Sequence, residues 1–163
     1  MKIGVALRET HDAETELAAE LLRVGERHKA DHDVYHLSRT LSEWCDRHVC
    51  RLAVDAPRYG ADLDADAVAD EQERGLIARA RERGSELVGR RPEPGLLLLR
   101  DMRDLHLAAA RASLAWTVLG QGAQAVSDQE LLDTVTACHP ETIRIMKWTV
   151  QKAKEASPQA LAG

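Results

Sequence analysis

Apolar residues recur with helical spacing in four long segments of the chain, and the segments fall into two pairs. Each segment repeats an apolar side chain every three or four positions, which places these side chains on one face of an α-helix. The four stripes are Leu17, Leu21 and Val24; Val34, Leu37, Leu41, Trp44, Cys45, His48 and Leu52; Leu98, Met102, Leu105, Ala109, Ala112, Trp116 and Leu119; and Leu132, Val135, His139, Ile143, Met146 and Val150. A polar break near residues 29–33 shifts the phase by about 80°. The pattern therefore predicts two antiparallel helical hairpins.

Capping and chain-breaking residues predict where these helices begin and end. Thr10 or Asp12 is expected to cap the first helix, which leaves residues 1–9 as an N-terminal arm. Ser127 opens a capping-box sequence that closes at Glu130, so it is expected to cap the last helix. Residues 156–163 are expected to be a frayed tail. The whole chain, residues 1–163, has the length of one domain.

The segment that joins the two hairpins is long. Residues 55–70 are acidic and contain proline and glycine, which is typical of a connecting loop, and a weaker helix is expected at residues 67–88. Two hairpins joined by one long crossover have the topology of ferritin-like bundles. We therefore predict an all-α fold, a ferritin-like four-helix bundle with an accessory helix in the crossover.

Composition agrees with this fold and excludes several classes of partner. The chain has 163 residues, 44% hydrophobic and 30% charged, with no Phe and only 3% aromatic residues, so a strand-rich domain is disfavoured. The net charge is −5, which is unsuited to a phosphate backbone, and we expect no nucleic-acid partner. The apolar segment at residues 105–126 is interrupted by Arg111, so we expect no membrane span.

Cysteine usage bears on the compartment. The chain has 3 cysteines, and Cys45 and Cys50 lie on different faces of one predicted helix, where they cannot easily form a disulfide. The opening sequence MKIGVALRET has an apolar run too short for a secretory signal. We therefore expect a reduced, cytoplasmic protein.

The chain resembles the ferritin-like superfamily, in particular the small stress-associated proteins of the YciF type. The resemblance covers both hairpins and is strongest in LGQGAQAVSDQELLDTVTACHPETIRIMKWTVQKAKE, which has a helix end of small residues, a polar turn and a capped last helix. It implies the bundle fold. It also implies a di-iron site, in which two helices each supply a Glu and the other two each supply a Glu-x-x-His sequence.

This chain departs from the di-iron pattern. It contains no Glu-x-x-His sequence, and the nearest matches end at His36 and His48. Ala109, Ala112 and Trp116 stand on the third long helix where a Glu is expected. We therefore predict a bundle with a degenerate di-metal site and without the oxidase activity of the family. It would work through oligomerisation or partner binding, in a stress or redox response, and we assign no catalytic residue.

Polar residues on the apolar stripes are the candidate site. His48 and His139 lie on different hairpins and are predicted to face the core. Imidazole, thiol and carboxylate groups together suit a borderline-soft ion such as zinc or iron. The candidate metal ligands are His48, His139, Cys45, Cys138, Glu14 and Glu20. The alternative is that the two histidines are hydrogen-bonded core residues, because buried polar groups usually find partners. We expect no cofactor, and keep iron or zinc, or a small molecule in a core pocket, as alternatives.

Three further expectations concern the surface. His28, His32 and His36 are predicted to lie around a solvated turn, and Asp101 and Asp104 to be surface charges. On the last helix, Ile145 and Trp148 form a second apolar strip, which predicts a homodimer. The alternative is that the accessory helix covers this strip with the apolar residues Leu76, Ile77 and Leu87.

Overall fold

The computed structural model of the protein describes residues 2–83 and 93–163, which form five α-helices and one short 3₁₀-helix. The α-helices are α1 (Ile3–Arg27), α2 (His32–Asp55), α3 (Ala67–Arg83), α4 (Pro94–Ala125) and α5 (Gln129–Ala162), and the 3₁₀-helix η1 (Ala56–Tyr59) directly follows α2. The described ranges contain no β-strand. The predicted all-α class is therefore confirmed.

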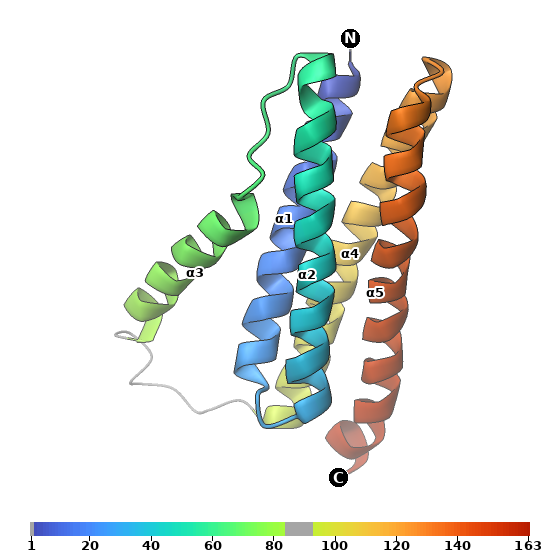
Figure 1. Ribbon diagram of the computed structural model, residues 1–163. Helices are drawn as coiled ribbons and strands as arrows, with labels where there is room; N and C mark the ends of the chain where they lie inside the picture. The colour runs from blue at the N-terminus through green and yellow to red at the C-terminus, as the bar shows by residue number, and fades with distance from the viewer. Residues whose placement is uncertain (1, 84–92) are drawn as a thin grey trace.

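Four long helices pack side by side as a bundle (Figure 1). α1 and α2 form one antiparallel hairpin and α4 and α5 the other, while α1 also packs along α4 and α2 along α5. α1 and α5 run in one direction, and α2 and α4 run in the other. The crossover carries α3, which lies outside the bundle and packs mainly against α1. The predicted end of this accessory helix, including Leu87, lies outside the described residues.

The interior of the bundle follows the predicted stripes on three of the four long helices. All seven stripe residues of α4, from Leu98 to Leu119, are buried, as are Leu17, Leu21 and Val24 of α1. On α2, Leu37 is 37% exposed and Trp44 is only partly buried, whereas Cys45 and His48 lie in the core. The helical period therefore predicted the core-facing sides of α1 and α4 and most of that of α2.

α1 begins earlier than predicted, so the expected N-terminal arm is almost entirely helical. The helix starts at Ile3, and Ile3 and Leu7 are buried in an apolar cluster with Leu52 and Trp116. Thr10, the expected cap, instead donates its hydroxyl hydrogen to the carbonyl oxygen of Ala6 inside the helix, at 2.8 Å. Burying a leucine stabilises by about 1.5–3 kcal/mol, so tertiary packing extends the helix beyond the predicted cap.

The ends of α5 also differ from prediction. Asp128, not Ser127, caps the helix by accepting a hydrogen bond from the Leu131 amide at 3.0 Å, while Ser127 adopts a positive φ of 57°. The helix then runs through Pro140 to Ala162, so residues 156–162 of the expected frayed tail are helical. Ala156 packs partly buried against the core, which keeps this last part ordered.

α5 is rotated relative to its predicted stripe. The buried side chains are Leu131, Val135, Cys138, Thr142, Ile145 and Thr149. Val150 is 41% exposed, and His139 and Ile143 are only partly buried. The prediction was wrong here because two of the core-facing residues are threonines, which a search for apolar side chains passes over.

The rotation removes the strip from which a homodimer was predicted. Ile145 is fully buried in the core of its own bundle, and Trp148 packs partly buried against the same core. The alternative cover is also wrong, because Leu76 and Ile77 on α3 are 61% and 52% exposed. The homodimer stays a prediction, without this strip to support it.

Over the described residues, no helix combines the length and the apolar character needed to cross a membrane.

Candidate functional site

One fully buried carboxylate, that of Glu14 on α1, receives hydrogen bonds from the other three helices of the bundle. Its Oε1 accepts from Trp116 Nε1 on α4 and from Thr142 Oγ1 on α5, both at 2.6 Å. Its Oε2 pairs with His48 Nδ1 on α2 at 3.1 Å. All four long helices therefore converge on a single side chain.

His48 joins this carboxylate to a second one. Its Nε2 pairs with Glu141 Oε2 on α5 at 3.0 Å, and Glu141 in turn contacts Arg47 at 3.2 Å. His48 is 2% exposed, whereas the side chains of Glu141 and Arg47 are 27% and 56% exposed. We call Glu14, His48, Glu141, Trp116 and Thr142 the Glu14 network. It leads from the centre of the core to the surface between α2 and α5.

The two nitrogens of His48 both face carboxylate oxygens, which fixes the charge of the ring. An ionised carboxylate only accepts hydrogen bonds, so both nitrogens must carry a proton. Burial alone lowers the pKa of His48, but hydrogen bonds to Glu14 and Glu141 outweigh it, and the pKa is raised. Burial likewise favours neutral Glu14, but the bonds from His48, Thr142 and Trp116 prevail and its pKa is lowered. The core therefore holds an imidazolium between two carboxylates.

The stability of the bundle should depend on pH through this pair. The pKa of Glu14 lies below 4.5, so its contribution is present above about pH 4.5 and is lost as the pH falls through the folded pKa. The pKa of His48 lies above 6.5, so its contribution is fully present below about pH 6.5 and is lost as the pH rises through the folded pKa. We expect His48→Gln to lower the free energy of unfolding most between these two values. Urea denaturation across a pH series measures this, and a difference that does not change with pH would contradict an ionised pair.

The aromatic ring of Trp116 completes the packing around His48. The two rings meet edge to face, with centroids 5.9 Å apart and an interplanar angle of 89°. Ala109 and Ala112 precede Trp116 on the same face of α4, and both are fully buried. Their small side chains allow the neighbouring helices to approach while the indole fills the layer of the core that contains Glu14.

Two cysteines flank the network, and both thiols are held in the protonated form. Burial and then the nearby Glu14 carboxylate raise the pKa of Cys45 well above its usual value. Burial raises the pKa of Cys138 to about 12, although Arg51 opposes the shift. Because a thiolate is the reactive form of cysteine, neither side chain is an activated nucleophile.

The helix register also keeps the two thiols apart. α2 and α5 are antiparallel, and Thr134 donates to Asp55 at 2.8 Å while His48 pairs with Glu141. In this register Cys45 and Cys138 lie on opposite sides of the His48 contact, separated by about 9 Å along the helix axis. A disulfide requires Cα atoms within about 7 Å, so the two cysteines do not form a bridge in this fold.

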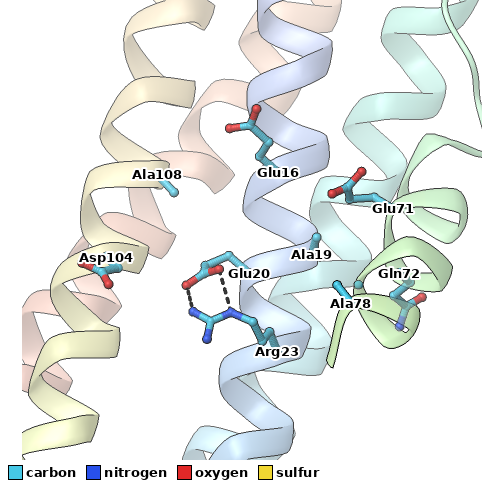
Figure 2. A pocket seen from close by; sticks show the side chains of 10 residues that line it. Glu16, Ala19, Glu20, Arg23, Glu71, Gln72, Ala78, Asp104 and Ala108 are labelled. Carbon is cyan, nitrogen blue, oxygen red and sulfur yellow. Dashed lines mark hydrogen bonds and ion pairs between the residues drawn. The ribbon is translucent and has the colours of Figure 1, made fainter. Parts of the chain in front are cut away.

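The predicted metal ligands are only partly brought together. Glu14, His48, Cys45 and Cys138 share one region of the core. His139 lies instead between α4 and α5, where its Nε2 meets Ser113 Oγ at 2.9 Å, and burial lowers its pKa. Glu20 points into a groove outside the core and pairs with Arg23 (Figure 2). The expected meeting of His48 and His139 across the core does not occur.

The donor set as arranged does not fit a metal ion. Glu14 already accepts hydrogen bonds from Trp116, Thr142 and His48, and both nitrogens of His48 donate to carboxylates, so the imidazole has no lone pair for a metal. The indole N–H of Trp116 is a donor only and cannot ligate. Within residues 2–83 and 93–163, no three His, Cys, Asp or Glu side chains are arranged to hold an ion.

Sequence reasoning missed three members of the network, namely Trp116 as a polar group, Thr142 and Glu141. One signal in the sequence pointed to Glu141. Cys138 and Glu141 are three residues apart, as are Cys45 and His48, and this spacing places both residues of each pair on one helix face. Thr142 gave no such signal, because threonine occurs on both buried and exposed faces of helices.

A second buried charge, Asp101 on α4, was wrongly predicted to lie at the surface. Asp101 is only 1% exposed. Its carboxylate accepts a hydrogen bond from Arg27 Nη1 at 2.8 Å and pairs with His28 Nε2 at 2.7 Å. Burial alone raises the pKa of Asp101, but His28 and the arginines outweigh it, and the pKa is lowered. Asp101 thus holds the end of α1 against α4. His28, predicted at a solvated turn, is only 10% exposed and pairs with Asp101, whereas the rings of His32 and His36 stack on each other.

A groove of about 490 Å³ separates α3 from α1 and α4 (Figure 2). Its charged lining residues include Glu16, Glu20, Glu71, Asp104 and Arg23. Each of the four carboxylates pairs with an arginine, respectively Arg111, Arg23, Arg74 and Arg103. The groove therefore offers little unbalanced charge to a ligand.

The Glu14 network thus places hydrogen-bonded charged groups inside the apolar core of the bundle. Comparisons of the chain with protein-family models, with curated proteins and with solved structures found no significant match.

Proposed function

We propose that this chain is a ferritin-like bundle in which a hydrogen-bonded ion network stands at the position of a degenerate di-metal site. It acts as a non-enzymatic scaffold, through oligomerisation or through binding a partner. The observation that carries the proposal is the bond from Trp116 Nε1 to Glu14 at 2.6 Å. The indole N–H of Trp116 places a partial positive charge against the central carboxylate, where a di-metal site would place a metal ion.

The order of the helices supports the ferritin-like part of this proposal. Two antiparallel hairpins are joined by a crossover long enough for the second and third long helices to run in the same direction (Figure 1). Glu14 on the first long helix meets His48 on the second, and His48 meets Glu141 on the last. Ferritin-like di-iron proteins likewise bring inward-facing ligands together from all the long helices of the bundle.

The chemistry of the network supports the non-enzymatic part. Glu14 is fully buried, its oxygens are already bonded, and the thiols of Cys45 and Cys138 are protonated. A general base needs a free lone pair within reach of a substrate, and a nucleophilic cysteine needs a thiolate. These groups therefore stabilise the core rather than react. The resemblance to the YciF-type proteins assigns such a scaffold to a stress or redox response.

The second candidate function is a metalloprotein with a His/Cys/carboxylate centre. It is favoured by one observation, that Glu14 and Glu141 both lie close enough to Cys45 and Cys138 to raise the pKa of the two thiols. Binding iron or zinc there would require Trp116 and His48 to release their hydrogen bonds to Glu14. The metal content of the purified protein separates the two functions.

We expect protein purified without a chelator to contain far less than one transition-metal ion per chain. The reason is that metal binding would have to break the three hydrogen bonds to Glu14. Elemental analysis measures the metal content, and the melting temperature with and without EDTA is the companion measurement. Two irons per chain, or a melting temperature that falls with EDTA, would favour the metalloprotein instead.

A further inference from the structure

The outward side of α4 carries large exposed apolar side chains between the exposed residues Arg100, Arg103 and Arg111. Leu107, Leu114 and Val118 are 61%, 65% and 55% exposed, and Leu96 near the start of the helix is 45% exposed. These residues lie about 170° around the helix from the stripe that faces the core. A helix that packs in a bundle on one side usually presents polar residues on the other. A second apolar side therefore indicates a second packing partner.

This apolar side continues into a groove between α4 and α5. The groove has a volume of about 310 Å³, and its apolar lining comes from both helices, with Leu99, Met102 and Leu107 on α4 and Val150 and Ala153 on α5. Of the polar lining residues, His106 and Thr149 hydrogen-bond to each other between the two helices, with His106 Nδ1 and Thr149 Oγ1 3.0 Å apart. The groove therefore offers an apolar surface between α4 and α5, which lie side by side.

The charges at this groove are positive. Arg103 lines it from α4 and Lys154 from α5, and no carboxylate is among its lining residues. In the part of the chain that the structure describes, Lys154 has no ion-pair partner. Arg103 reaches Asp104, which lines the other groove, beside α3. Asp104 therefore balances the charge of Arg103, and Lys154 is the unbalanced cation beside this apolar groove in a chain with a net charge of −5.

We propose that the α4–α5 groove binds an amphipathic helix of another protein that carries apolar anchors and acidic side chains. The proposal rests on the proposed function, since it names the partner class of a non-enzymatic scaffold. Two adjacent helices present a groove into which a ridge of side chains on a third helix fits, and apolar anchors at helical spacing bind in this way. An acidic side chain on that helix complements Lys154, which lines the groove from α5.

Two other occupants fit the groove less well. A second copy of the chain, paired through this same face by a two-fold axis, would bring the cations of both copies together. An anionic membrane is bound by a convex amphipathic helix that inserts its apolar side, whereas this face is concave between α4 and α5. The acidic helix is the occupant that satisfies both the shape and the charge.

A displayed library of amphipathic helices tests the proposal. The probes are peptides of about 20 residues, with Leu, Ile, Met or Phe at anchor positions and Glu, Lys or Ser beside them. We expect the selected peptides to be enriched in Glu, and their binding to weaken at higher ionic strength. Leu107→Glu and Lys154→Glu should each weaken it by at least about tenfold. Val54→Glu is the matched control, because Val54 is 78% exposed on α2 and lies outside the groove.

Several results would overturn the proposal. These are selection of no peptide, enrichment in Lys, or equal binding to the Leu107→Glu variant. If the wild-type chain co-sediments with phosphatidylglycerol vesicles and the Leu107→Glu variant does not, the face binds a membrane instead. A wild-type dimer that Leu107→Glu converts to a monomer would assign it to a second copy. The metal content is measured separately, so failure here and failure of the scaffold proposal are distinguishable.

Discussion

Replacing Glu14 with alanine is expected to lower the free energy of unfolding by about 3–5 kcal/mol near neutral pH. The variant leaves the Trp116 N–H and the Thr142 hydroxyl without an acceptor, and it leaves His48 with only one carboxylate. Each buried donor without a partner costs about 1–3 kcal/mol, and the cavity adds to this. Urea denaturation followed by circular dichroism at the helical signal measures the difference.

Two further variants make the result specific to the network. Glu16 lies two residues along the same helix, its side chain is 61% exposed, and it pairs with Arg111, so Glu16→Ala should cost only about 0–1 kcal/mol. Glu14→Gln should fall between the two alanine variants. Its amide oxygen still accepts from Trp116 and Thr142, and a neutral His48 can accept from its NH₂ group. A Glu14→Ala variant no less stable than Glu16→Ala would show that the network does not hold the core.

The network links the four long helices in a way that apolar packing alone does not. Leucine side chains on a helix tolerate a shift by one turn, because the same type of contact forms again. The Glu14 carboxylate does not, since Trp116, Thr142 and His48 must all reach it from different helices. Buried polar groups with every partner in place favour one arrangement over its neighbours. A fixed arrangement of this kind suits a scaffold that must present a constant surface.

The sequence predicted those features that depend on local periodicity. The seven members of the stripe from Leu98 to Leu119 follow one another every three or four positions without a gap, so only one side of α4 can face the core. The break near residues 29–33 was predicted for the same reason, and α1 and α2 are indeed separated there, between Arg27 and His32. His48 was predicted to face the core because it lies between apolar residues on its stripe.

The sequence did not predict features that depend on partners far along the chain. Thr142 faces the core because Glu14 accepts its hydrogen bond from 128 residues away, and this turns Ile145 inward and Val150 outward. Similarly, Asp101 is buried because Arg27 and His28, at the end of α1, supply its charge partners. A carboxylate on an amphipathic helix usually faces water, so local pattern alone gave the opposite prediction.

Replacing Asp101 with alanine is therefore expected to have the second largest effect, about 2–3 kcal/mol of lost stability. The variant leaves the charges of Arg27 and His28 without their carboxylate at the point where α1 ends against α4. The expected loss is smaller than at Glu14, because the side chain of Arg27 is 37% exposed and can turn to water. Chemical denaturation near neutral pH measures it, and hydrogen exchange in the last turn of α1 should increase in the variant.

The neighbouring Asp104 provides the matched control for this prediction. Its side chain is 37% exposed and pairs with Arg103 beside it in sequence, so Asp104→Ala should cost about 0–1 kcal/mol. The pKa of Asp101 lies below 3.8, so its contribution is present above about pH 3.8 and is lost as the pH falls through the folded pKa. The difference between wild type and Asp101→Ala should therefore shrink in strong acid. Equal costs for the two alanine variants would mean that Asp101 is solvated, as its sequence pattern alone predicts.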